Sequence, residues 1–244
     1  KMDRPLILVS NDDGINAKGI RTLIKLMNKL GDVYVVAPDS PKSGMGHAIT
    51  INSSISCKRV IIDQGPQIEY ESSGTPADCV KLAINKLLKR KPDLCVSGIN
   101  HGSNSSINVV YSGTMSVAIE AALAGISSIG FSLLDNSEDA NFEESEEYIL
   151  KICSDILNNN LQKGICLNVN IPRTKINEKI KGIRICKQAR GDWKEIFTKV
   201  NNINDKIDYQ LSGHFVNYDK DEDTDEWALN NHYISVVPVQ FDLT

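Results

Sequence analysis

The chain of 244 residues lacks the features that mark membrane proteins, secreted proteins and nucleic acid-binding proteins. Its longest apolar runs are too short to cross a bilayer, and its first residues do not resemble a signal peptide. No membrane partner is therefore expected, and a cytoplasmic location is predicted. The formal net charge of −4 gives no electrostatic reason to expect a nucleic acid polymer as a partner.

Closely spaced cysteines are also absent. The six cysteines are scattered, and no Cys-x-x-Cys pair occurs among them. Several lie inside apolar runs, as Cys95 does between Leu94 and Val96. We interpret them as small core residues in a reducing compartment, so neither a disulfide framework nor a zinc site is expected.

A short apolar run near the N-terminus ends in two adjacent carboxylates. Residues 5–9 are typical of a strand buried on both faces, and Asp12, Asp13 and Gly14 follow shortly after. Neighbouring anions repel each other, so a fold that keeps both ionised usually supplies a cation. Oxygen ligands favour Mg²⁺, Ca²⁺ or Mn²⁺ over softer metals. A solvated Asp-Asp-Gly turn is the alternative that this tripeptide leaves open.

An amphipathic helix and a second strand come next. Apolar residues recur at helical spacing from Ile20 to Leu30, Gly31 ends the predicted helix, and residues 32–38 form another apolar run. Strand, helix and strand with short links predict a βαβ unit with parallel strands. Ligands of such sheets bind beyond the carboxyl ends of the strands, where Asp12 and Asp13 fall.

The loop over residues 39–48 is rich in glycine and small polar residues. Its glycines do not complete a dinucleotide fingerprint, and the loop follows the second strand instead of the first, which weakens the case for a dinucleotide-dependent oxidoreductase. We interpret it as a loop that approaches a ligand, with Ser43 and Gly44 as candidate substrate contacts. A plain connection is the alternative.

Alternating strands and helices are predicted for the middle of the chain. Thr75 is a plausible N-cap for a helix that begins near Pro76. A β-hairpin excursion from the main sheet is predicted over residues 49–73. The further predicted strands are at 93–97, at 126–134 and, on the edge of the sheet, at 165–172. The further predicted helices are at 115–124 and at 138–157, the second with an acidic first turn.

Two more polar segments follow the strand at 93–97. The first is the loop over residues 98–106, and the second is the triplet Ser112, Gly113 and Thr114. The triplet stands where a helix N-terminus presents free N–H groups and a favourable dipole, which suits an anion or a phosphate. Ordinary hydroxyl capping of the helix is the alternative.

The character of the chain shifts near residue 173. We predict a catalytic domain over residues 1–172 and an extended region over 173–244 that is buried by another subunit, because isolated arms and hairpins seldom hold themselves together. The acidic run at 219–226 is interpreted as a solvated loop, with cation binding as the alternative. Strands are predicted at 180–186, 209–216 and 232–239.

The polar segments are expected to meet at one edge of the sheet. They offer two carboxylates, amide and hydroxyl oxygens, two histidines and a helix N-terminus. A metal site beside an anion seat is what phosphoester hydrolysis requires, because the metal can polarise the phosphoryl oxygens while N–H groups hold the phosphate.

Motifs along nearly the whole chain resemble the survival protein E (SurE) family of 5′-nucleotidases. They are Ser10-Asn11-Asp12-Asp13-Gly14, Ala37-Pro38, Ser43-Gly44-Met45-Gly46-His47, Gly74-Thr75-Pro76-Ala77-Asp78, Ser97-Gly98-Ile99-Asn100, Tyr111-Ser112-Gly113-Thr114, Trp227-Ala228-Leu229 and Tyr233-Ile234-Ser235-Val236. The resemblance implies a Rossmann-like, mostly parallel sheet flanked by helices, and a C-terminal region that forms a homodimer or homotetramer. It also implies hydrolysis of nucleoside 5′-monophosphates with one divalent cation, Mg²⁺ or Mn²⁺. Some members of the family also act on 3′-monophosphates or short polyphosphate.

The resemblance also implies roles for single residues. The metal ligands would be Asp12, Asp13, Ser43 and Asn100. The phosphate-binding residues would be Asn11, Asn104 and the triplet Ser112, Gly113 and Thr114.

The proton-transfer steps remain open at the level of sequence. A metal-activated water is the preferred nucleophile, and a covalent phosphate on Asp12 is the alternative. His47 and His101 are the candidate proton donors to the leaving oxygen, although either can equally be a buried or capping histidine. A nucleotide-binding module without turnover is the rival to the enzyme as a whole.

Overall fold

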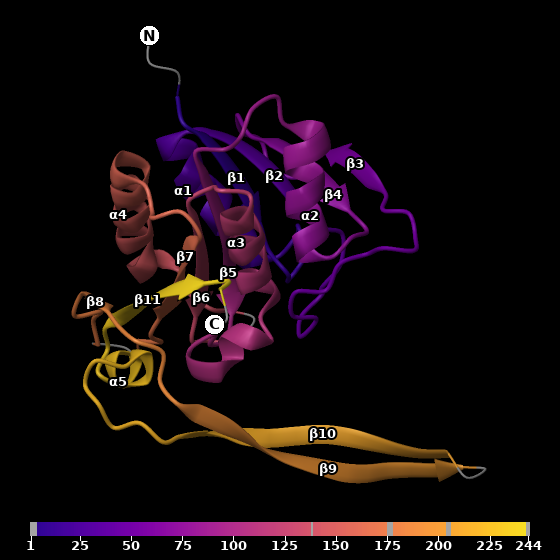
Figure 1. The fold of residues 1–244 in the computed structure, drawn as a ribbon, viewed down its shortest axis with the longest axis vertical. Helices are drawn as coiled ribbons and strands as arrows, with labels where there is room; N and C mark the ends of the chain where they lie inside the picture. Colours follow the sequence, from indigo (N-terminus) through magenta and orange to yellow (C-terminus); the bar gives the residue numbers. More distant parts are fainter. Residues whose placement is uncertain (1–3, 138, 175–177, 204–205, 243–244) are drawn as a thin grey trace.

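The computed structural model describes residues 4–137, 139–174, 178–203 and 206–242. One sheet runs through the body with helices on both faces, and a separate two-stranded hairpin projects from it (Figure 1). The predicted α/β class with mostly parallel strands and an extended C-terminal hairpin is confirmed.

The main sheet has the strand order β3-β4-β2-β1-β5-β6-β7-β11-β8. All pairs from β4 across to β7 are parallel, whereas β3 and β11 run antiparallel to β4 and β7. The order reverses at β1, which has β2 on one side and β5 on the other, and ligands of such sheets bind at this switch point. The strands are β1 Leu6–Ser10, β2 Asp32–Pro38, β3 Cys57–Val60, β4 Ile68–Ser72, β5 Leu94–His101, β6 Ser128–Leu133, β7 Ile165–Ile171, β8 Ile183–Ile185 and β11 Ile234–Gln240.

Helices cover the sheet in two layers. Ile7 and Val9 of β1 pack in the core beneath α1 and α4, while Leu8 points into the core beneath α2 and α3, as expected for a strand buried on both faces. The helices are α1 Lys18–Leu30, α2 Pro76–Leu82 with a π-helical continuation η1 Ala83–Leu87, the 3₁₀ turn η2 Ser106–Val110, α3 Gly113–Leu123, α4 Glu143–Asn159 and α5 Asp225–Asn230.

The hairpin predicted at residues 49–73 forms, but it does not leave the sheet. β4 pairs in parallel with β2, so β3 and β4 extend the main sheet at its edge. Arg21 of α1 donates to both carboxylate oxygens of Glu69 on β4, one of them at 2.9 Å, and to Asp63 at 2.7 Å. This ion-pair network holds the hairpin against the body.

The prediction that residues 165–172 form an edge strand is wrong. β11 adds on the far side of β7 in antiparallel register, with Pro238 opposite Leu167. The polar residues Asn168 and Asn170 of this strand are both buried. Asn170 Oδ1 accepts a hydrogen bond from the Asn104 backbone N–H at 2.8 Å, and Asn168 donates to the Asn104 carbonyl at 2.8 Å.

Helix α4 begins at Glu143, several residues later than predicted. The side chain of Asn141 accepts from the Glu143 N–H at 2.9 Å, and Phe142 is buried, so the segment just before the helix forms an anchored turn. The acidic first turn is present, with Glu143 and Glu144 in it. Glu138, which the prediction also placed in this helix, lies outside the described residues.

The C-terminal region adds elements to the body as well as the hairpin. The predicted strands near 180–186 and 232–239 are β8 and β11 of the main sheet. The hairpin pairs β9 Gly191–Ile203 with β10 Lys206–Asn217, so residues 187–208, predicted only as a polar segment, contain a long strand. No described helix is both long enough and apolar enough to cross a membrane.

Two interpretations of single residues need correction. The acidic run is only partly solvated, because Asp219 and Asp225 are buried. Asp225 accepts backbone hydrogen bonds from Ser106 and Ala189 at 2.8 and 2.9 Å, so it anchors α5 to two other segments. Cys57 is exposed on β3, whereas the other five cysteines are buried as predicted.

Candidate active site

The polar loops meet at the carboxyl end of β1. The Lys42 N–H donates to the Asp12 carbonyl at 2.7 Å, and the Gly46 N–H donates to the Tyr111 carbonyl at 3.2 Å. The loop over residues 39–48 is therefore tied to both the Asp-Asp turn and the segment that enters α3. The predicted convergence of these loops is confirmed.

Asp12 lies under the N-terminus of α3. Its side chain is buried, and its Oδ1 accepts a hydrogen bond from the Thr114 hydroxyl at 2.6 Å. Burial raises the pKa of Asp12 to about 6, against the lowering effect of the Thr114 hydroxyl and backbone N–H and with a smaller raising effect from Asp13. A Cβ on Gly113 would lie 2.6 Å from the Asp12 Cβ, so only glycine allows the helix to approach this closely.

Asp13 completes the acidic pair and lies beside Ser43 and His101. Burial raises the pKa of Asp13, while the His101 ring, the His101 backbone N–H and the Ser43 hydroxyl oppose that shift. The Asp13 Oδ2 atom is buried without a hydrogen-bond partner among the described residues, as is Asn11 Oδ1. Buried oxygens are normally satisfied, so these atoms indicate room for a group that binds to them.

The oxygen atoms at this point suit a hard cation. Asn100 uses its amide nitrogen to donate to the Gly102 carbonyl at 3.0 Å, so its amide oxygen remains for a ligand. Two carboxylates, a hydroxyl and an amide oxygen form a donor set preferred by Mg²⁺ or Mn²⁺. The described residues contain no group of three or more His, Cys, Asp or Glu side chains able to hold a metal, so a histidine- or cysteine-rich centre is not present in them.

The helix N-terminus at α3 is capped and also faces Asp12. Ser112 Oγ accepts from the Met115 N–H at 3.0 Å, so hydroxyl capping, the alternative raised from the sequence, does occur. The Thr114 hydroxyl is engaged with Asp12. Gly44, in the loop over residues 39–48, has a φ of 73°. A Cβ at this position would have no atom within 4 Å, so the backbone of the loop is accessible there.

Asn104 belongs to a buried polar network, and no contact with the acidic pair is among those that the structure describes. Its side-chain amide donates to Ser132 Oγ at 2.8 Å, while its backbone joins Asn168 and Asn170 of β7. The network fixes the loop after β5 to the ends of β6 and β7. A direct contact of Asn104 with phosphate stays a prediction.

The two histidines occupy different surroundings. His101 lies near Asp13, and its ring packs edge-on against Phe142 at 5.4 Å between centroids. His47 Nε2 lies 2.9 Å from a carboxylate oxygen of Glu120 on α3, whose other oxygen binds Lys81 at 2.6 Å. Only His101 therefore has a contact with the acidic pair among the contacts that the structure describes.

Sequence reasoning did not identify Glu120, which holds His47, or Glu226, which lines a cavity beside Asn100 and His101. Glu120 sits alone in a helix of small residues, where nothing in its neighbours marks it. Glu226 is hidden in the acidic run, which was interpreted as solvated. Trp193 lines the same cavity, and an isolated aromatic in a polar segment was the one available signal for it.

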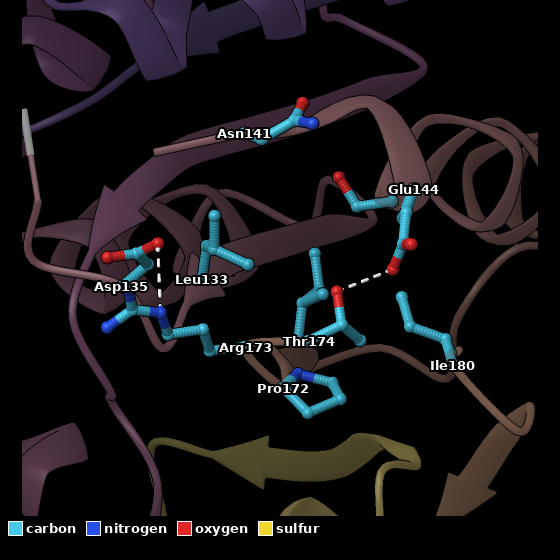
Figure 2. Close-up of a pocket in the computed structure, with 10 residues that line it drawn as sticks. Leu133, Asp135, Asn141, Glu144, Pro172, Arg173, Thr174 and Ile180 are labelled. Atoms are coloured by element: carbon cyan, nitrogen blue, oxygen red, sulfur yellow. Dashed lines mark hydrogen bonds and ion pairs between the residues drawn. The ribbon is translucent and has the colours of Figure 1, made fainter. Parts of the chain in front are cut away.

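A smaller cavity of about 220 Å³ lies at the carboxyl ends of β6 and β7 and contains none of the predicted site residues (Figure 2). Arg173 forms an ion pair with Asp135 at 3.4 Å, and Thr174 donates to Glu144 at 2.6 Å across the same space. Arg173 is thus already paired, so the described lining of this cavity offers no free cation for a phosphate.

The fold and the site define a doubly wound, Rossmann-like α/β protein with an acidic, oxygen-rich centre at its topological switch point. Its family follows from the comparison with known proteins: the chain belongs to the SurE family, because the model described as survival protein SurE matches residues 7–195.

Named relatives and a solved structure agree with that family. The chain is 59% identical to the 5′-nucleotidase SurE of Flavobacterium psychrophilum, over 100% of this chain and 94% of the relative. It is 60% identical to the 5′-nucleotidase SurE of Christiangramia forsetii, over 99% and 93% of the two chains. The crystal structure of the SurE protein from Aquifex aeolicus superposes with a TM-score of 0.83 at 38% identity, covering 98% of this chain and 95% of the other.

Proposed function

We propose that this chain hydrolyses nucleoside 5′-monophosphates to the nucleoside and inorganic phosphate, with one divalent cation, Mg²⁺ or Mn²⁺, as cofactor. The 5′-nucleotidase activity itself is supported by relatives of that name that match nearly the whole chain at 59 and 60% identity. The observation that carries the rest is the acidic pair of buried Asp12 and half-buried Asp13, whose Oδ2 atom has no hydrogen-bond partner among the described residues.

The cation would be held by Asp12, Asp13, Ser43 and Asn100. Burial disfavours the charge on both carboxylates, and a divalent cation between them would reverse that effect. When bound, the cation would polarise the phosphoryl group and lower the pKa of a water molecule.

The chain's own groups position the reacting parts. Thr114 fixes the orientation of Asp12 through its hydroxyl, and Gly113 lets the α3 N-terminus lie against the same side chain. The positive end of that helix favours a phosphate in front of it. His101 is the better-placed proton donor for the leaving 5′ oxygen, because it lies beside Asp13 whereas His47 is engaged by Glu120.

Release of inorganic phosphate from AMP tests the proposal. We expect release with Mg²⁺ or Mn²⁺, none with excess EDTA, and recovery when the cation is restored. Asp12→Asn and Asp13→Asn are expected to lower kcat at least a hundredfold. Asp155→Asn is the matched control, because Asp155 is an exposed carboxylate on helix α4, outside the loops of the site.

A nucleotide-binding module without turnover is the alternative. It predicts AMP binding by calorimetry but no metal-dependent phosphate release from any nucleotide. Full activity of the Asp12→Asn protein would instead contradict the site assignment. Activity on 3′-monophosphates and short polyphosphate, and a cytoplasmic location, belong to the same proposal and need separate measurements.

A homodimer or homotetramer is also part of the proposal. The β9–β10 hairpin projects from the body (Figure 1). It carries exposed apolar side chains. Isolated two-stranded hairpins are only marginally stable in water, so burial by another copy of the chain would stabilise this one. The exposed apolar residues are Ile196, Phe197, Val200, Ile207, Tyr209 and Leu211.

A further inference from the structure

A cavity of about 450 Å³ opens directly beside the candidate metal site. Asn100 and His101, which belong to that site, line one side of it. The other side comes from the base of the β9–β10 hairpin and from α5, through Trp193, Phe215 and Glu226. Its volume falls within the range of small-molecule sites, roughly 300 to 1,000 Å³.

One wall of the cavity is a fixed aromatic surface. Trp193 and Phe215 pack with ring centroids 6.4 Å apart, and the Trp193 Nε1–H donates to Asn108 Oδ1 at 2.8 Å. A Cβ on Gly191 would lie 2.1 Å from the Phe215 ring, so glycine at that position lets the ring close over the base of the hairpin. Trp193 remains 39% exposed, which leaves ring surface free to stack on a flat heteroaromatic group.

Another wall of the cavity is polar and carries the carboxylate of Glu226. Glu226 Oε1 accepts a hydrogen bond from the Ser105 hydroxyl, and no described cationic side chain pairs with Glu226. Its neighbour Asp225 fixes the helix by accepting from the Ser106 N–H at 2.8 Å. An ionised carboxylate only accepts hydrogen bonds, so this wall selects a ligand that presents hydroxyl or amino donors.

Charge then orients the ligand. A phosphate would be repelled by Glu226 but attracted to a cation at Asp12 and Asp13, whereas an uncharged group rich in hydroxyls and rings suits the cavity. A nucleoside monophosphate has these two ends. The adjacency of Asn100 and His101 to both regions allows one molecule to reach from one to the other.

We infer that this cavity is the nucleoside subsite, in which Trp193 stacks on the base and the free oxygen of Glu226 accepts a hydrogen bond from the ribose 2′-hydroxyl. This inference depends on the proposed function for its substrate class. It gives the base of the hairpin and α5 a role in substrate selection.

Kinetics with matched substrates test the two contacts separately. Trp193→Ala is expected to lower kcat/KM for AMP about tenfold more than for ribose 5-phosphate, because only AMP carries a base to stack. Glu226→Ala is expected to lower the preference for AMP over 2′-deoxy-AMP about tenfold, because a hydrogen bond to a charged acceptor is lost. Both effects should appear in KM. The controls Phe241→Ala and Glu222→Gln, at exposed positions outside the cavity, should leave both ratios unchanged.

Binding of adenosine supplies a readout that needs no metal and no turnover. The chain has two tryptophans, so Trp227→Phe leaves Trp193 as the single reporter. We expect adenosine to quench its fluorescence in the presence of EDTA. Absence of quenching, or equal loss of activity toward AMP, ribose 5-phosphate and 2′-deoxy-AMP in the cavity variants, would overturn the inference. Failure of wild-type protein to release phosphate from any ester would refute the proposed function instead, whether or not adenosine quenches.

Discussion

Asp12 combines a chemical role with an unfavourable environment. Because burial raises its pKa to about 6, its ionised form destabilises the metal-free fold at neutral pH. The penalty is fully present above pH 6, and it disappears below the usual aspartate range, near pH 4, where the group is protonated in the folded and unfolded states alike. A bound cation would remove the penalty at neutral pH.

We therefore expect Asp12→Asn to stabilise the metal-free protein while abolishing phosphate release. The asparagine oxygen can still accept from Thr114, and the buried charge is gone. The gain should be on the order of 1–3 kcal/mol at pH 8 and close to zero at pH 4, since each pKa unit corresponds to about 1.4 kcal/mol. Thermal denaturation in EDTA at the two pH values measures it. An equal shift at both would show that burial of the charge is not the cause.

Gly113 illustrates how little space the site leaves. A methyl group there would lie 2.6 Å from the Asp12 Cβ, so Gly113→Ala must push α3 or the Asp12 side chain away. We expect a loss of kcat of at least tenfold, because a displacement of this size disrupts positioning at a reacting centre. Circular dichroism should show a folded protein. Wild-type kcat in this variant would contradict the close approach.

The loop over residues 39–48 depends on contacts beyond its two backbone ties. Glu120 of α3 binds His47 of the loop and Lys81 of α2, and although burial alone would raise the pKa of Glu120, these partners hold it below its usual range. Glu120 thereby fixes the loop that presents Ser43 to Asp13.

Glu120→Gln is expected to weaken Mg²⁺ binding several-fold, because one charge-assisted contact that positions the loop is lost. Titration of activity and of protein stability with Mg²⁺ both report this affinity. Glu147→Gln, an exposed acid on α4, is the matched control. Unchanged Mg²⁺ affinity in both variants would remove Glu120 from the support of the site.

The interior of β7 depends on its polar network. Asn170→Ala would leave the buried Asn104 N–H without its acceptor at 2.8 Å. A buried donor left unsatisfied costs about 1–3 kcal/mol, so we expect urea unfolding to show a loss of that size. Asn158→Ala on the exposed side of α4 serves as the control and should change stability by less than about 0.5 kcal/mol.

Sequence patterns predicted the centre of the fold better than its edges. The continuous apolar run is followed by apolar residues at helical spacing, and this change predicted that Asp12 and Asp13 lie just beyond β1. The prediction depends only on residues that are close together in the sequence. The edge position predicted for β7 was wrong, because β11 comes from the last part of the chain to pair with it. The burial of Asn168 and Asn170 likewise depends on Asn104, more than 60 positions away. Strand β9 was missed because many of its residues are polar and because, within the described part of the chain, it pairs with β10 alone.

The candidate site shows the same limit. The acidic pair, Ser43 and the helix N-terminus follow from local motifs at strand ends, and these lie together. Glu226 could not be predicted, because its place beside Ser105 depends on α5 docking onto the loop after β5 through Asp225. Residues near positions 100 and 226 come together only when the whole chain is folded, so no local sequence pattern predicts their contact.

At the scale of the whole molecule, the projecting β9–β10 hairpin raises the question of whether two or more copies of the chain associate. Phe197 and Leu211 lie directly opposite each other on β9 and β10, and both are more than half exposed. Replacing both by serine removes an apolar pair of the hairpin without changing its backbone pairing. If the hairpin is buried by another copy of the chain, each buried Phe or Leu contributes about 1.5–3 kcal/mol per subunit, so the double variant should dissociate at concentrations where the parent does not.

Sedimentation equilibrium at micromolar concentration measures this directly. We expect a dimer or tetramer for the parent chain and a shift toward monomer for Phe197→Ser with Leu211→Ser. The control pair Thr198→Ser with Gln210→Ser lies one register step along the same hairpin and should keep the parental assembly. A parent chain that sediments as a monomer would contradict burial of the hairpin by a second copy. The candidate active site and the cavity beside it would then be formed by one chain alone.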